Sequence, residues 1–195
     1  MKNINTILFD DFTILDALGP VEVFRCLETF YSIGFYSMNG GPIRTKPFLG
    51  IETKPIRDIQ SFDILLIPGG FGVRTLINDL SYISQIKELA TNSENVLTVC
   101  TGSALLAKTG LLKGIKATSN KLAFDWVVQQ DPDVHWIRKS RWVVDGKFYS
   151  SSGVTAGIDM ALGFVRDKIN NEKAENICKG LEYIWNKNNE EDLFV

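Results

Sequence analysis

Residues 97–104 read Leu-Thr-Val-Cys-Thr-Gly-Ser-Ala, an apolar run that stops at Cys100 and is followed at once by a Thr-Gly-Ser step. A short apolar run before a glycine turn predicts a buried strand, and Gly102–Thr109 behind it predicts a short helix. Cys100 is therefore expected at a strand-to-helix turn. A side chain on such a sharp turn is exposed at the edge of the sheet, as the serine of α/β hydrolases is.

The same alternation of apolar runs and amphipathic segments extends along the chain and predicts parallel strands joined by helices. The predicted strands are Thr6–Phe9, Gly34–Met38, Ile64–Ile67, Val96–Val99 and Lys116–Thr118. The predicted helices are Pro20–Thr29, Leu80–Thr91, Gly102–Thr109, Leu122–Gln129, Ala156–Lys168 and Glu172–Trp185. Turn residues between β-formers add hairpins at Pro42–Thr53 and Trp142–Tyr149, the second around an Asp-Gly step. The pattern predicts an α/β fold, a three-layer α/β/α sandwich of flavodoxin type. We expect a mostly parallel sheet with a small β-hairpin addition, in a single domain over residues 1–195.

Composition narrows the function classes. The 195 residues carry a formal net charge of −2 and show no basic stripe, so we expect no nucleic-acid partner. No apolar run approaches the ~20 residues that span a bilayer, and the N-terminus lacks a signal-peptide pattern. Three widely spaced cysteines and one histidine fit neither a disulfide framework nor a zinc site. We therefore expect a cytoplasmic protein with no membrane partner, metal or cofactor.

Ligands of open parallel sheets bind outside the carboxyl ends of the strands, and Cys100 is expected at that edge. The following helix would point its N-terminus at the thiol, and the positive end of a helix lowers the pKa of a cysteine. Gly102, which has no Cβ, allows the backbone to approach closely. The alternative is that Cys100 is a small buried packing residue, the common role of a free cysteine.

Other segments are predicted to reach the same edge, and each has a plainer interpretation. Asp16 follows the first strand and is either a helix cap or a carboxyl that exchanges a proton with the thiol. Gly69-Gly70 is either a tight turn or a source of backbone N–H groups for an oxyanion. Thr101 offers a hydroxyl and an N–H beside the thiol, or caps the helix. Ser152 and Gly153 form either a helix start or a pocket wall.

Four further residues are predicted to be structural. His135 lies in an expected strand between charged stretches and away from the carboxyl edge, so a surface or structural role is favoured. Cys26 and Cys178 fall in amphipathic helices and are expected to pack. Glu22 is expected on a solvated helix face.

Several short motifs together resemble the ThiJ/PfpI superfamily, whose fold is of the class I glutamine amidotransferase type. These motifs are Asp16…Gly19-Pro20…Glu22-Val23-Phe24, Pro68-Gly69-Gly70, Cys100-Thr101-Gly102-Ser103, residues 107–112, Ala117-Thr118 and residues 152–159. The pattern is most similar to the branch that holds isonitrile hydratases and the sensor domains of AraC-type regulators.

The resemblance implies a flavodoxin-like fold, usually in a homodimer, with a strained nucleophile cysteine at Cys100 and an acidic partner at Asp16. It also implies an oxyanion site made by the N–H groups of Gly70 and Thr101. In the hydratase branch the threonine after the nucleophile takes part in the reaction, and Thr101 matches it. Gly69, Gly102, Asn120, Ser152 and Gly153 would then line the pocket.

One position departs from the resemblance. The protease and glyoxalase-like branches carry a histidine shortly after the Ala-Thr step, where this chain has Asn120. Asparagine is no general base, so a Cys-His peptidase mechanism is not expected. No helix-turn-helix segment follows the motifs, so we expect no DNA-binding regulator in one chain.

Three hypotheses follow. The first is a cysteine-dependent hydratase or amidase-like enzyme acting on a small molecule. The second is a redox or metabolite sensor that uses the same thiol without turnover. The third is a partner-binding protein with an apolar surface supplied by its four tryptophans.

Overall fold

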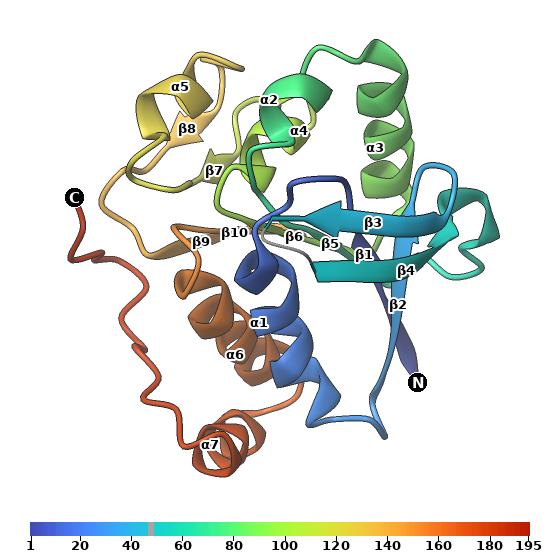
Figure 1. The fold of residues 1–195 in the computed structure, drawn as a ribbon. Helices are drawn as coiled ribbons and strands as arrows, with labels where there is room; N and C mark the ends of the chain where they lie inside the picture. Colours follow the sequence, from blue (N-terminus) through green and yellow to red (C-terminus); the bar gives the residue numbers. More distant parts are fainter. Residues whose placement is uncertain (47–48) are drawn as a thin grey trace.

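A computed structural model describes residues 1–46 and 49–195 and contains an eight-stranded sheet in the order β3-β4-β2-β1-β5-β6-β10-β9 (Figure 1). Neighbouring strands from β4 through β10 are parallel, whereas β3 and β9 at the two ends run antiparallel to β4 and β10. The strands of this sheet are β1 (Lys2–Ile7), β2 (Tyr31–Ser37), β3 (Gly41–Thr45), β4 (Leu49–Pro55), β5 (Ile64–Ile67), β6 (Asn95–Val99), β9 (Trp142–Asp145) and β10 (Phe148–Ser151).

Helices cover both faces of the sheet. They are α1 (Ile14–Arg25), α2 (Val73–Leu76), α3 (Leu80–Asn92), α4 (Gly102–Lys108), α5 (Phe124–Val128), α6 (Ala156–Lys168) and α7 (Asn171–Gly180), with a 3₁₀ turn at Ile56–Asp58. One apolar cluster joins the sheet to α2, α3 and α4, and the other joins it to α1, α6 and α7. Figure 1 shows the same arrangement, with helices on each side of a central sheet. The predicted flavodoxin-like α/β/α sandwich is therefore confirmed.

Both predicted hairpins are present. β9 and β10 pair around a turn in which Gly146 has φ +58°, so the two turn residues are Gly146-Lys147, one position later than predicted. β3 pairs with β4, and the middle of their turn, residues 47–48, lies outside the described residues. The predicted strand Lys116–Thr118 is only β7 (Lys116–Ala117), which pairs with β8 (His135–Trp136) in a separate two-stranded sheet.

The first helix begins earlier than the sequence predicts. It starts at Ile14, and Pro20 lies inside it rather than in its first turn. Proline removes the N–H that would bond the carbonyl four residues back. Close packing on α6 accounts for Gly19, because a Cβ there would lie 2.8 Å from Ile158 Cγ1. The consequence for the site is that Asp16 lies in the first helical turn of α1 rather than in a loop.

The last helix ends earlier than predicted, at Gly180 rather than Trp185. Glu182 has φ +50°, a left-handed conformation that stops the helix. The next residues hydrogen-bond to Asp159 in α6: Tyr183 through its hydroxyl and Trp185 through its indole N–H. These hydrogen bonds to α6 hold Tyr183 and Trp185 outside the helix, although the sequence pattern predicts that the helix continues to Trp185.

Candidate active site

Three loops at the carboxyl edge of the sheet meet around Cys100. β1 leads into α1, which carries Asp16; β5 ends at Gly69-Gly70; and β6 ends at Cys100. Gly69 N–H donates to Asp16 Oδ2 at 3.0 Å, and Gly70 N–H donates to Thr101 Oγ1 at 3.0 Å. The structure therefore brings together the residues that the sequence analysis assigned to this edge.

Cys100 has a strained backbone that its neighbours hold in place. Its φ is +56°, in the left-handed region that a side chain with a Cβ rarely adopts. Its N–H lies 3.1 Å from Ser152 O, and its carbonyl accepts hydroxyl bonds from Ser103 at 2.9 Å and Ser119 at 2.8 Å. Strain of this kind persists only where the surroundings over-determine it, and it concentrates at functional sites.

Asp16 is completely buried beside the thiol. Burial raises the pKa of its carboxyl to about 7, although the Gly69 N–H and the contact with Cys100 both act to lower this pKa. Oδ1 accepts no N–H or hydroxyl bond from the part of the chain that the structure describes. A carboxyl with a pKa near 7 can both accept and donate a proton at neutral pH.

The expectation of a lowered thiol pKa is wrong for the free site. Burial, and then the negative charge of Asp16, raise the pKa of Cys100 to about 12, while the N–H and hydroxyl of Thr101 act to lower it. The side chain is only 8% exposed, and α4 has only seven residues. Desolvation of the thiolate raises the pKa of Cys100 more than the short helix α4 lowers it. The thiol therefore stays protonated until a base removes its proton.

Thr101 connects the two loops on either side of the thiol. It makes no side-chain cap of α4, because its hydroxyl accepts the Gly70 N–H instead. The predicted oxyanion site consists of the N–H groups of Gly70 and Thr101. That role stays a prediction, and it requires Gly70 N–H to share or leave its bond to Thr101.

Gly69 and Gly102 are needed for close backbone approach. A Cβ on Gly69 would lie 2.6 Å from Thr101 N and 2.9 Å from Asp16 Oδ2. A Cβ on Gly102 would lie 2.4 Å from Ile67 O. Real side chains do not tolerate such distances to backbone atoms, so the absence of a Cβ lets the three loops meet.

Asn120, Ser152 and Gly153 line a pocket of about 520 Å³. Cys100 is not among the residues of its wall, but two loops connect them: Ser152 O accepts the Cys100 N–H, and Ser119, next to Asn120, bonds the Cys100 carbonyl. Asn120 Oδ1 accepts the Ala123 N–H at 2.9 Å. The side chain that replaces the histidine of other branches thus stabilises the turn before α5.

The sequence patterns did not reveal the residues that bond the Cys100 carbonyl or the charged residues that line the pocket. Ser103 and Ser119 hold the Cys100 carbonyl, and Arg141 and Lys121 line the pocket. Serine near a turn has no distinctive spacing. No local signal marks Arg141 either, because the residue that fixes it, Asp159, is 18 positions away in the sequence.

The residues predicted to be structural occupy ordinary positions. His135 is exposed in β8, and Glu22 pairs with Arg25 on the surface of α1. Cys178 is buried in α7, whereas Cys26 is exposed at the end of α1 rather than packed. Among the described residues, no group of three or more His, Cys, Asp or Glu side chains is arranged to hold a metal ion. None of the described helices is long and apolar enough to cross a membrane.

Comparison with known proteins agrees with this geometry. The DJ-1/PfpI family pattern matches residues 2–167. The chain belongs to the DJ-1/PfpI family. A solved ThiJ/PfpI family protein from Pseudomonas syringae superposes with a TM-score of 0.83 at 26% identity, over 93% of this chain and 75% of that one. The family resemblance inferred from the motifs is therefore confirmed.

Two curated relatives of this DJ-1/PfpI protein have different roles. Isonitrile hydratase from Pseudomonas putida is 30% identical over 92% of this chain and 78% of the relative. The HTH-type transcriptional regulator CdhR from Pseudomonas aeruginosa is 24% identical over 82% of this chain. The match covers 48% of that regulator, about half of its length. The family therefore includes both enzymes and regulators.

Proposed function

We propose that the protein is a cysteine-dependent hydratase or amidase-like enzyme that acts on a small molecule with an electrophilic carbon, such as an isonitrile. The observation that carries the proposal is the pairing of a positive-φ cysteine with a buried carboxyl whose pKa is about 7. Packing alone does not explain the strain at Cys100, nor why Asp16 Oδ1 accepts no N–H or hydroxyl bond from the described residues. The similarity to isonitrile hydratase supports the substrate class.

The first step joins sulfur to carbon. Asp16 accepts the proton of the Cys100 thiol as the sulfur attacks the terminal carbon of the isonitrile, and then delivers this proton to the same carbon. The product is a thioimidate on Cys100. Because burial makes a free thiolate unfavourable, proton removal coupled to attack is the route that fits a thiol of raised pKa.

The second step consumes water. Asp16 accepts a proton from water as the water oxygen adds to the thioimidate carbon, and delivers that proton to the nitrogen. The carbon–sulfur bond then breaks as the hydroxyl proton of the adduct passes through Asp16 to the Cys100 sulfur, and an N-substituted formamide leaves. Thr101 N–H would stabilise the charge that develops during this step.

A substrate panel tests the proposal. Alkyl and aryl isonitriles, primary amides and 2-oxoaldehydes would be incubated with the wild type, Cys100→Ala and Cys26→Ala, and products measured by mass spectrometry. We expect formamide from isonitriles, lost in Cys100→Ala and retained in Cys26→Ala, which removes an exposed thiol far from Asp16. Absence of any Cys100-dependent product would overturn the proposal.

A sensor without turnover is the second candidate, supported by the similarity to transcriptional regulators over most of this chain. In that case peroxide would oxidise Cys100 to the sulfinic acid. Intact mass before and after peroxide treatment, with Cys100→Ala as the control, would show a two-oxygen adduct. A stable adduct together with an inactive substrate panel favours this candidate.

A further inference from the structure

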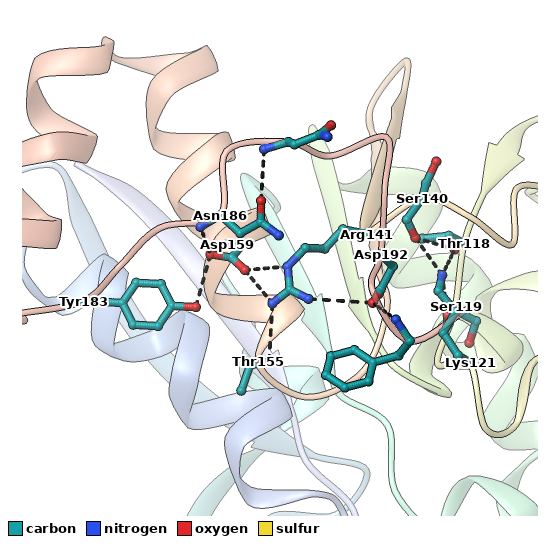
Figure 2. A network of polar contacts seen from close by, with 12 residues as sticks. Thr118, Ser119, Lys121, Ser140, Arg141, Thr155, Asp159, Tyr183, Asn186 and Asp192 are labelled. Carbon is teal, nitrogen blue, oxygen red and sulfur yellow. Dashed lines mark hydrogen bonds and ion pairs between the residues drawn. The ribbon is translucent and has the colours of Figure 1, made fainter.

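The pocket of about 520 Å³ contains an ionic network that the proposed reaction does not use. Arg141, at the start of β9, and Lys121, before α5, line it together with Asp192 of the C-terminal segment, defined here as residues 189–195. Figure 2 shows Asp192 facing Arg141. The pocket falls in the size range of small-molecule sites.

Arg141 is held rigidly with one edge turned to the pocket. Its Nε donates to Asp159 Oδ2 at 2.7 Å, and Nη2 contacts the same oxygen at 2.6 Å. Asp159 is fixed in turn by Tyr183 and by the backbone N–H of Asn186 (Figure 2). The remaining terminal nitrogen, Nη1, faces Asp192. Five donors in a fixed plane make such an arginine a preorganised carboxylate receptor.

Lys121 supplies a second cation at the same pocket. Its Nζ donates to Ser140 O at 2.6 Å, to Thr118 Oγ1 at 3.0 Å and, at the longer distance of 3.4 Å, to Ser119 O, all of them uncharged. Partial burial and the charges of Arg138 and Arg141 lower the pKa of Lys121, to about 8, while Asp192 acts to raise it. The two cations of the pocket are therefore balanced by Asp159 and Asp192, and removal of Asp192 leaves one positive charge in excess.

Asp192 is anchored by its backbone, whose N–H donates to Lys139 O at 2.7 Å, but its carboxylate is poorly matched to its surroundings. Its Oδ1 lies 3.9 Å from Arg141 Nη1, beyond hydrogen-bond distance, and accepts the Phe194 N–H at 3.1 Å. Its Oδ2 is buried and has no hydrogen-bond partner among the residues that the structure describes. The segment around it forms neither helix nor strand. A buried carboxylate with one unpartnered oxygen is costly, so a better-fitting carboxylate gains by replacing it.

We propose that this pocket binds the carboxylate of a small-molecule ligand, which displaces Asp192 and pairs with Arg141 and Lys121. The inference rests on the proposed function, because it gives the substrate class: an electrophilic small molecule that also bears a carboxylate. The loop at Ser152 forms one wall of the pocket and accepts the Cys100 N–H. The carboxylate and the electrophilic carbon of such a molecule would therefore bind to adjoining parts of the protein.

Titration with butyrate, and with uncharged butyramide as the matched probe, tests the inference by calorimetry at pH 7. All variants carry Cys100→Ser, so neither probe reacts and binding is separated from turnover. Removing the tethered competitor in Asp192→Asn should tighten butyrate binding about tenfold. Glu191→Gln, which removes an exposed charge next to Asp192, should leave it unchanged. Lys121→Gln, which keeps Asp192 and carries Cys100→Ser like the other variants, should weaken butyrate binding about tenfold.

Equal butyrate affinity with and without Asp192, or equal affinity for butyramide and butyrate, would overturn the inference. Tighter binding of inorganic phosphate than of butyrate would overturn the assignment to carboxylates. If Asp192→Asn does not fold, the Lys121→Gln result decides alone. Isonitrile turnover without butyrate binding overturns this inference and leaves the proposed function standing. Butyrate binding without turnover overturns the proposed function and with it the substrate class, and leaves only the carboxylate site.

Discussion

The hydroxyl of Thr101 accepts the backbone N–H of Gly70 at 3.0 Å, which joins the loop after β5 to the loop after β6 directly beside Cys100. The same residue acts through its N–H and hydroxyl to lower the pKa of the Cys100 thiol. Thr101 thus couples loop geometry to thiol ionisation. The loop contact depends on the hydroxyl alone, whereas the thiol pKa depends on both the hydroxyl and the backbone N–H, so removal of the hydroxyl should change both properties.

Thr101→Val should destabilise the protein and raise the thiol pKa further. The substitution leaves Gly70 N–H without its acceptor, and an unsatisfied buried donor costs about 1–3 kcal/mol. Urea unfolding measures the stability, and iodoacetamide alkylation of Cys100 against pH measures the thiol. Thr101→Ser keeps the hydroxyl and should behave like the wild type in both. Equal behaviour of Val and Ser would show that the hydroxyl has no part in either property.

Asp16→Asn should make Cys100 easier to ionise while it abolishes turnover. Asp16 acts by its charge to raise the pKa of the thiol, so its neutralisation lowers the pH midpoint of alkylation. The wild-type midpoint is expected above the ~8.5 of a free thiol. Loss of the proton carrier should reduce turnover by about 10²–10⁴-fold. Cys26, exposed at the end of α1, serves as the reference thiol in the same digest. An upward shift in Asp16→Asn would contradict the pairing.

Asp16 also predicts how stability depends on pH. Its pKa is about 7 in the folded protein against 3.8 for the free group, so the folded state holds the proton more tightly. Its contribution to stability is fully present below pH 3.8 and is lost as the pH rises through 7. By the relation of 1.36 kcal/mol per pKa unit, the loss is about 4 kcal/mol at most.

Asp16→Asn removes that dependence. The difference in unfolding free energy between Asp16→Asn and the wild type should grow in favour of the variant from pH 4 to pH 7, then level off. Urea unfolding across this range measures it. Asp58→Asn, which removes an exposed carboxyl, is the matched control for the loss of one acidic charge. A flat difference for Asp16→Asn would mean that its carboxyl is not buried as the structure has it.

The layers of the fold and the meeting of the loops could be predicted from the sequence, because both follow from local patterns. Ile64–Ile67 and Ala156–Lys168 have the predicted bounds, since a continuous apolar run marks the strand and the turn residues 152–155 stand directly before the helix. The strands β1, β5 and β6 are neighbours in the sheet, and they precede Asp16, Gly69 and Cys100. Because parallel strands bring their carboxyl ends to one edge, these three residues meet there.

The remaining features depend on contacts between distant residues. Nothing local shows that Gly19-Pro20 would lie inside a helix, where Gly19 packs closely on α6. The raised pKa of Cys100 depends on burial, which a turn pattern does not report. The position of Asp192 beside Arg141 joins residues that are 51 positions apart in the sequence. Such pairs lie beyond the reach of periodicity or capping rules.

Gly69→Ala should disrupt the site without unfolding the sheet. The new methyl group would lie 2.6 Å from Thr101 N and Oγ1 and 2.9 Å from Asp16 Oδ2, so the backbone atom on one side or the carboxylate on the other must shift. Displacement of about 1 Å at a catalytic site can reduce activity about 10²-fold. Overpacking of this kind costs about 1–3 kcal/mol. Gly180→Ala is the matched control, because a Cβ there meets nothing within 4 Å. Isonitrile turnover and urea unfolding of both variants measure the effect, and wild-type turnover in Gly69→Ala would show that Asp16 and Thr101 need not meet at this loop.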